Sequence, residues 1–273
     1  MESARERIFN IPPVVVALVA TLSAIHLLVA FVLPMDAGEA LLELFAFEPL
    51  RYGGASGAGE AWPGGIAADL WTFVTYAFFH FNLIHLGFNL IWLVAFGTPV
   101  ARRFGAARFL GFFGFTAAAG AFAHLVTHLG QNMPAIGASA AVLGMMAAAL
   151  RFVFQPDGPL GLLPLGEDAA YRVPAKPLIA MLRDRRMILF VLAWFVLNAV
   201  VALPQFTIPG VDAAVAWQAH VGGFVAGLVG FSAFDPGPLA PAGADMLDAK
   251  AAANARAPDR KTPATEDDPS TQP

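Results

Sequence analysis

The sequence contains no cysteine and few charged side chains. The absence of cysteine excludes disulfide bonds, thiol catalysis and thiolate metal sites. Charged residues make up only 13% of the 273 residues, whereas 58% are hydrophobic, which is too apolar for a water-soluble domain of this size. No basic cluster is interleaved with aromatic residues, so no nucleic-acid partner is expected. The composition therefore indicates a protein that lies in the lipid bilayer.

Long segments without Asp, Glu, Lys or Arg predict six membrane-spanning helices. A helix needs about 20 apolar residues to cross a bilayer, and the segment 109–150 holds two such helices, separated at Gly130–Pro134. The expected spans are approximately 11–34, 83–101, 107–129, 137–154, 187–203 and 214–234. The first is too long for the core of a signal peptide and is interpreted as a retained span. The predicted fold class is all-α, a polytopic membrane protein with a bundle of six transmembrane helices.

Three regions are expected along the chain: a cytoplasmic N-terminal segment (1–10), a six-helix membrane domain (11–234) and a cytoplasmic tail (235–273). The tail is rich in proline, alanine and charge, so disorder is predicted. Of the 16 basic residues, all but Arg51 flank the same ends of the predicted spans. By the positive-inside rule, both termini are expected in the cytoplasm, and the Ala-rich chain suits a bacterial inner membrane.

Unusual polar residues lie near the starts of spans two, four and six, which run in the same direction. His85 and Asn89 lie four residues apart and share a helix face. His80 lies five residues before His85 and cannot share that face if the helix extends so far. Ser139 begins span four, and His220 lies one to two turns into span six. Each alone is more often a packing residue, but together they favour a functional site, because buried polar groups are costly in a bilayer.

A serine and a histidine at similar depth predict a catalytic dyad. His220 would take the proton of the Ser139 hydroxyl as a general base. His85, Asn89 and backbone N–H groups at the start of span four could bind an oxyanion, and Gly137 allows a tight turn before the serine. No carboxylate lies within the spans to complete a triad. Neither a cofactor nor a metal ion is expected.

Small residues on spans four and six could bring the two helices close together. Gly223 and Gly227 form one small face, and Ala140 and Gly144 offer another. Ordinary membrane packing explains each glycine pair equally well, so the pairs alone do not indicate catalysis.

The polar motifs together resemble those of the rhomboid family of intramembrane serine proteases. The resemblance covers about residues 11–234 and rests on His80-x4-His85-x3-Asn89, Gly137-Ala138-Ser139 and Ala219-His220-x2-Gly223-x3-Gly227. It implies that Ser139 is the nucleophile, that His220 is the base, and that His85 and Asn89 help to bind the oxyanion. It also implies a structural role for His80 near the first outer loop.

The function that the resemblance implies is cleavage of transmembrane protein substrates near the outer leaflet. Water would reach Ser139 from outside, beneath a cap formed by the loop 204–213. Lateral entry of the substrate is expected past the fifth span, around Trp194, Phe195 and Leu197. The sequence makes no prediction of the oligomeric state.

The sequence departs from the family pattern at several positions. Rhomboids usually have glycine after the catalytic serine, whereas this chain has Ala140. An aromatic residue often follows four positions after the serine, where this chain has Leu143. The Trp-Arg pair common in the first outer loop is absent, and Trp62 and Trp71 are the nearest aromatic residues. The segment Gly54–Gly57 matches the Gly-x-Ser-Gly pattern, but a Gly-rich loop cannot hold a hydroxyl in fixed register with a histidine.

Two other functions fit parts of the sequence. A rhomboid-like pseudoprotease would bind membrane helices without cleaving them, although such relatives usually lack the serine or the histidine. A transporter or metal carrier could use His80, His85, His124 and His128, but no intramembrane carboxylates or broken helices in matching halves are evident. For His124 and His128 a packing role is the simpler interpretation, and for His26 packing or a backbone hydrogen bond.

Overall fold

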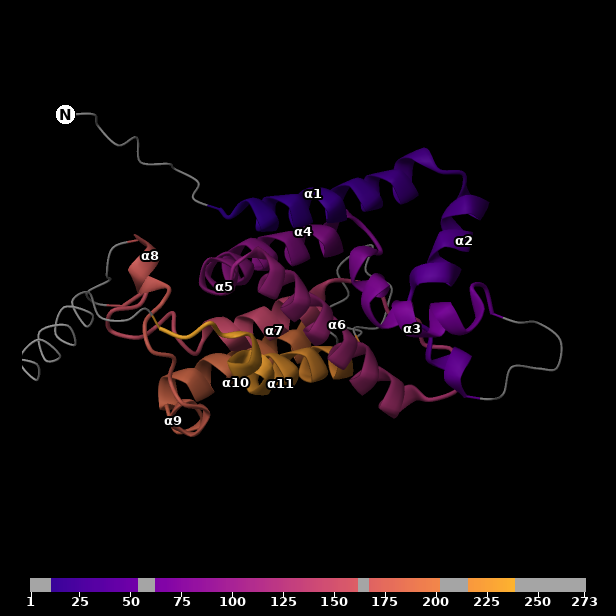
Figure 1. The fold of residues 1–273 in the computed structure, drawn as a ribbon. Coiled ribbons are helices and arrows are strands. Elements are labelled where there is room, and N and C mark those ends of the chain that lie inside the picture. Colours follow the sequence, from indigo (N-terminus) through magenta and orange to yellow (C-terminus); the bar gives the residue numbers. More distant parts are fainter. Residues whose placement is uncertain (1–10, 54–61, 162–166, 202–215, 239–273) are drawn as a thin grey trace, which may run out of the picture. The chain divides into compact units, whose positions relative to one another are not determined.

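The computed structural model describes residues 11–53, 62–161, 167–201 and 216–238 (Figure 1). These residues form helices, and no strand occurs among them, which confirms the all-α fold class. The nearest approach to a strand pair is an isolated antiparallel bridge between Phe47 and Ala135. The predicted cytoplasmic segment 1–10 lies outside the described residues.

Within the described ranges, three helical segments are long and apolar enough to cross a membrane. The first is α1 (Pro13–Leu27), which continues into a π-helical turn (Leu28–Val32). The second joins α4 (Leu83–Trp92), a π-helical turn (Leu93–Gly97) and α5 (Thr98–Phe104), and the third is α6 (Ala106–His128). The turn in the second precedes Pro99, whose ring nitrogen cannot donate a helical hydrogen bond.

Three further helices lie where the remaining spans are predicted. They are α7 (Ser139–Ala149), α10 (Arg185–Val201) and α11 (Trp217–Phe234). The first two are short, and α11 begins with the polar sequence Trp-Gln-Ala-His. The arrangement is compatible with six spans, and the number of crossings stays a prediction.

The first outer loop contains two helices that apolar run length did not reveal. They are α2 (Met35–Phe45) and α3 (Gly65–Thr75). Gly64 precedes α3 with a left-handed φ of 79°, which glycine adopts readily. Two short helices, α8 (Glu167–Ala170) and α9 (Leu178–Leu182), lie in the predicted inner loop.

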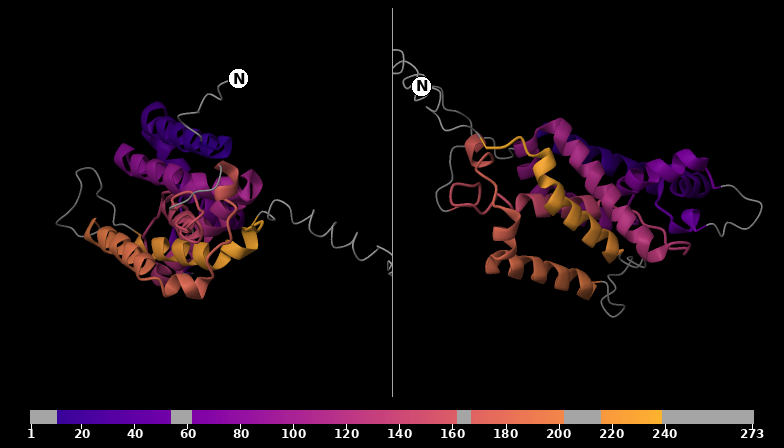
Figure 2. Two further views of the ribbon diagram at one scale, coloured as in Figure 1. Left: turned by 90° about the vertical axis from the view of Figure 1, so that its left-hand side faces the viewer. Right: turned by 60° about the horizontal axis from the view of Figure 1, so that its bottom comes forward.

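The helices α6, α7 and α11 pack against one another at the centre of the bundle (Figure 2). Every residue of α7 from Ala140 to Ala149 is buried. At 1.5 Å per residue this helix is only about 16 Å long, roughly half the thickness of a bilayer core. A helix so short is accommodated there because neighbouring helices surround it, while its first residue, Ser139, is half-buried.

The predicted inner end of the bundle is held together by a buried arginine. Arg103 on α5 donates two hydrogen bonds of 2.9 Å to the carboxylate of Asp235, just after α11. It also donates to the carbonyls of Tyr171 and Val173. The ordered contacts therefore continue past residue 234, and residues 239–273, the rest of the predicted disordered tail, lie outside the described residues.

Candidate active site

The structure brings Ser139 and His220 together, although 81 residues separate them in the sequence. Ser139 is the first residue of α7, and His220 lies in the first turn of α11. The distance from Ser139 Oγ to His220 Nε2 is 2.8 Å. When Nε2 is unprotonated, the serine hydroxyl donates to it. Nδ1 of His220 is buried and has no hydrogen-bond partner among the described residues.

Glycines on α11 allow the two helices to approach closely enough for this hydrogen bond. A Cβ atom added at Gly223 would lie 2.1 Å from the carbonyl oxygen of Ala140. One added at Gly227 would lie 2.2 Å from the carbonyl oxygen of Gly144. The two small faces are thus in backbone contact, and any larger side chain would push α11 away from α7.

A third helix accommodates Ala140, which stands where the family usually has glycine. Ala140 is fully buried, and a Cβ atom at Gly120 on α6 would lie 2.5 Å from its methyl group. The same atom at Gly120 would lie 2.9 Å from the carbonyl oxygen of Ala219 on α11. Sequence reasoning missed Gly120, although an apolar helix rich in Gly and Ala is a sign of close packing. Its missing side chain leaves the space that the Ala140 methyl group occupies.

His85 lies against the segment that leads into α7. Its backbone N–H is capped by the side chain of Asn82 at 2.9 Å, which starts α4 at Leu83. Its ring faces Gly137, where a Cβ atom would lie 2.8 Å from His85 Nε2. Gly137 has a φ of +125°, a conformation that residues with a side chain rarely adopt. Gly137 therefore allows both the turn and the approach of the imidazole.

Asn89 is buried one turn after His85 on the same helix face. Its side-chain amide donates a hydrogen bond of 2.8 Å to the carbonyl of His85. An amide group has two N–H donors, so one remains for another acceptor. His85 and Asn89 thus lie on one face of α4, as predicted. One of the two N–H groups of the Asn89 amide is used in a hydrogen bond within the helix.

His80 reaches the site from the segment before α4. Its carbonyl accepts a hydrogen bond of 3.1 Å from His26 Nδ1 on α1, which matches the backbone hydrogen bond expected for His26. Its ring lies 5.2 Å from that of His85, edge to face. Its Nε2 accepts a long hydrogen bond of 3.5 Å from the backbone of Ala138. His80 therefore links α1 to the residues immediately before Ser139.

The first outer loop is anchored by residues that sequence reasoning missed. The buried side chain of Arg51 pairs with Asp69 at 3.1 Å and donates to the carbonyls of Glu43 and Pro63. Its guanidinium also lies over the ring of Trp62, 5.3 Å from the ring centroid. The chain thus forms a Trp-Arg contact from residues that are not adjacent in sequence. The signal was present, because Arg51 is the one basic residue on the predicted outer side.

Glu48 joins the outer loop to the segment before α7. Its carboxylate accepts hydrogen bonds from the backbone of Leu50 at 3.1 Å and of Met133 at 3.2 Å. Burial raises the pKa of Glu48 above its usual value. The neighbouring Phe47 pairs with Ala135, and the carbonyl of Tyr76 accepts from Gly137 at 3.0 Å. The residues before Ser139 are therefore held on both sides.

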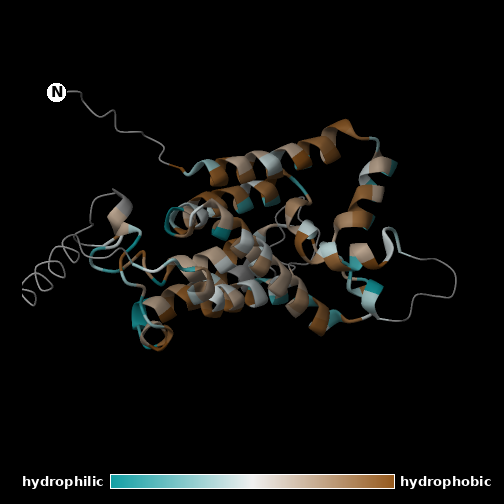
Figure 3. Cartoon of the chain, viewed as in Figure 1, coloured by the Kyte–Doolittle hydropathy of each residue, from teal (hydrophilic) through white to brown (hydrophobic). Residues whose placement is uncertain are grey.

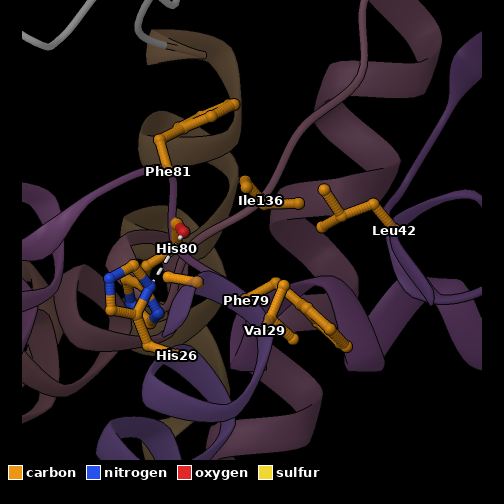
Figure 4. Close-up of a pocket in the computed structure, with 8 residues that line it drawn as sticks. His26, Val29, Leu42, Phe79, His80, Phe81 and Ile136 are labelled. Atoms are coloured by element: carbon orange, nitrogen blue, oxygen red, sulfur yellow. Dashed lines mark hydrogen bonds between the residues drawn. The ribbon is translucent and has the colours of Figure 1, made fainter. Parts of the chain in front are cut away.

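A cavity of about 170 Å³ lies beside His80, between α1, α2 and the segment before α4 (Figure 4). His26 and His80 lie on one side of the cavity, and Leu42 and Ile136 lie on the other (Figure 4). Ile136 is three residues before Ser139. The lining is mainly apolar, so the cavity suits an apolar group.

Aromatic side chains connect α10 to its neighbours. The rings of Trp194 and Trp92 on α4 meet edge to face at 4.5 Å, and Phe195 meets Phe224 on α11 at 5.5 Å. Leu143 packs in the same cluster as Phe224, and no aromatic ring stacks on His220 in the described part of the chain. The predicted cap 204–213 and the segment Gly54–Gly57 lie outside the described residues.

The histidines considered as metal ligands make local contacts. His124 Nε2 lies 2.8 Å from the carbonyl oxygen of Met133, and the ring of His128 lies 4.4 Å from that of His124. Among the described residues, no three His, Asp or Glu side chains gather as a metal site would require. These contacts fit the packing interpretation.

A comparison with models of protein families identifies the family of this helical bundle. The family model of the Rhomboid domain matches residues 67–233, more than half of the chain, including all four polar site residues on α4, α7 and α11. The chain belongs to the rhomboid family. With its apolar helices, this rhomboid is a multi-pass membrane protein.

Curated rhomboids share short segments with this chain. It is 38% identical over 52 residues to the rhomboid protease GlpG of Enterobacter sp. (strain 638), which covers 18% of this chain and 19% of that protein. It is 42% identical over 40 residues to the rhomboid protease GlpG of Serratia proteamaculans (strain 568), which covers 15% and 14%. The chain thus matches less than a fifth of the length of either relative.

Proposed function

We propose that this rhomboid is an intramembrane serine endopeptidase that cleaves transmembrane protein substrates near the outer leaflet. The observation that carries the proposal is the 2.8 Å contact between Ser139 Oγ and His220 Nε2. This distance lies within the range of roughly 2.6–3.2 Å over which a nucleophile can transfer its proton to a base. The names of the two relatives as rhomboid proteases support the same activity.

The reaction that follows has two stages. In the first, His220 takes the Ser139 proton while Oγ bonds to the substrate carbonyl carbon. The resulting oxyanion is stabilised by the first N–H groups of α7, which lack helical acceptors, and by His85 and Asn89. Each donor of this kind typically contributes ~2.7–4 kcal/mol. The C–N bond then breaks, and His220 donates the proton to the leaving amine. In the second stage, His220 takes a proton from water, which attacks the acyl ester; the C–Oγ bond then breaks, and His220 returns the proton to Ser139 Oγ.

Substrates reach the site from the side, past α10. A transmembrane helix must unwind locally before cleavage, because an intact helix uses its carbonyls internally. The contact between Trp92 and Trp194 would have to open for this entry. The cavity beside His80 has room for an apolar side chain of the unwound substrate. Catalysis takes place in a bacterial inner membrane with both termini in the cytoplasm, as the distribution of basic residues and the bacterial relatives support.

The test compares the wild type with Ser139→Ala, His220→Ala and the control Ser23→Ala, each purified as the full chain. Ser23 lies on α1, which carries neither Ser139 nor His220, and its replacement removes one serine hydroxyl, as Ser139→Ala does. We expect wild type and S23A to cleave a model transmembrane substrate and to react with a fluorophosphonate at Ser139, whereas S139A does neither. A folded wild type that neither cleaves nor reacts would support the non-cleaving pseudoprotease instead.

A further inference from the structure

The inner ends of α9 and α10 carry an exposed surface that combines basic and apolar side chains. Arg183 follows α9, and Arg185 and Arg186 begin α10; all three side chains are exposed. Ile179 and Leu182 on α9 are exposed beside them. Figure 3 shows hydrophilic residues directly next to hydrophobic ones at this end of α9 and α10. We call these five residues the basic collar.

The basic collar has an excess of positive charge that no carboxylate in the described ranges pairs with. Asp184 lies between Arg183 and Arg185 but is not part of the collar; it pairs with Lys176, and this contact lowers the pKa of Asp184. Its carboxylate also accepts a hydrogen bond of 3.0 Å from the backbone of Arg186. The guanidinium groups of the three arginines make no ion pair with any described carboxylate. Three positive charges therefore remain for a partner.

Two of these arginines lie at a helix end, which favours anions over cations. They occupy the first turn of α10, which contains no acidic residue. The start of a helix carries a partial positive charge, so cations there are destabilising and anions are stabilising. Asp184 supplies one carboxylate at this helix end, but it is also paired with Lys176, so the two arginines add positive charge that a further anion would offset.

The apolar members of the collar indicate where that negative group resides. Ile179 and Leu182 are 66% and 57% exposed, which is costly in water but favourable among acyl chains. The exposed side chains Leu189 and Leu192 continue this apolar surface along α10. A surface that is basic at one level and apolar at the next matches a membrane interface, where phosphate groups lie above acyl chains. A soluble acidic partner would leave the leucines in water.

We propose that the basic collar binds the headgroups of anionic phospholipids, with Ile179 and Leu182 inserted among their acyl chains. Arg183, Arg185 and Arg186 contact the phosphates, and an arginine is well suited to this because its planar group donates two parallel hydrogen bonds. The bound lipids hold the inner end of α10. This binding is independent of peptide cleavage, so it is tested without any protease assay.

The experiment measures lipid retention by native mass spectrometry on the purified full chain. Phosphatidylglycerol and phosphatidylcholine with identical acyl chains are titrated into a neutral detergent. One basic residue near an anionic surface corresponds to about a fivefold change in affinity. We therefore expect wild type to bind phosphatidylglycerol more tightly than phosphatidylcholine. In R183Q/R185Q/R186Q the ratio of the two affinities should be at least about tenfold smaller.

Two controls separate lipid binding from loss of structure. Arg108→Gln removes an exposed arginine from the start of α6 at the same end of the bundle, where no second exposed arginine adjoins it, and should keep the preference. R183K/R185K/R186K keeps the positive charge and should retain most of the preference for phosphatidylglycerol. Equal retention of both lipids by wild type, or an undiminished preference in the triple glutamine variant, would overturn the proposal.

Discussion

Replacing Gly223 with alanine tests whether close helix contact is what aligns the serine with the histidine. The new Cβ atom would lie 2.1 Å from the carbonyl oxygen of Ala140 and 2.7 Å from its carbonyl carbon. Both are backbone atoms and cannot rotate away. To reach ordinary contact, α11 must move by about 1 Å, because packed interiors leave no spare room. His220 lies one turn before Gly223 and moves with it.

The size of the effect follows from the hydrogen bond. A 1 Å shift lengthens the 2.8 Å contact to Ser139 beyond the range of roughly 2.6–3.2 Å for a nucleophile and its base. Misplacement on this scale costs about 10²-fold in rate. We therefore expect Gly223→Ala to lower kcat/KM for a model transmembrane substrate by about 100-fold, and to slow the reaction of Ser139 with a fluorophosphonate in parallel.

The matched control is Gly230→Ala on the same helix. There the new Cβ atom meets Phe115 Cε1 at 2.5 Å, and an aromatic side chain can turn aside. This variant should keep most of its activity. If folded G223A, judged by circular dichroism, reacts as quickly as G230A, then backbone contact between α7 and α11 does not set the alignment, and the reasoning is wrong.

Three further predictions follow from other contacts. Gly137→Ala forces a φ of +125° on alanine and displaces His85, so cleavage should fall by about 10²–10³-fold, as for loss of an oxyanion donor, in the same substrate assay. Asp235→Asn leaves the buried charge of Arg103 uncompensated and should lower the free energy of unfolding by about 3–5 kcal/mol in mixed micelles. Because burial raises the folded-state pKa of Glu48, the folded protein binds this proton more tightly than the unfolded chain does. Stability should therefore be greatest below the ordinary value of 4.5 and fall as pH rises through the raised value, and Glu48→Gln should abolish that fall in thermal unfolding measured across pH.

The sequence was sufficient for the features that depend on apolar length and on spacing within one helix. Runs without charge located α1, α4 to α6 and α10, and the four-residue spacing placed His85 and Asn89 on one face. The similar depth of Ser139 and His220 followed from the direction of their helices. Their contact depends on helix rotation, which apolar periodicity does not determine when a helix is hydrophobic all round.

The features that were missed depend on contacts between distant segments. Arg51 pairs with Asp69 and donates hydrogen bonds to two carbonyls across the predicted outer loop, and nothing in its local sequence indicates these partners. The helices α2 and α3 are too short for a search based on membrane-spanning length. His80 was difficult to place because its position depends on where α4 begins, and the cap Asn82 was the readable signal for that start.

The short, enclosed α7 isolates the serine from changes in membrane thickness. A helix that faces lipid tilts or shifts when the bilayer becomes thinner or thicker. No residue of α7 from Ala140 to Ala149 meets acyl chains, so such hydrophobic mismatch acts on the outer helices α1 and α10 and reaches Ser139 only through them. Bilayers of different thickness should therefore alter how substrates enter this rhomboid far more than they alter the geometry of its serine and histidine.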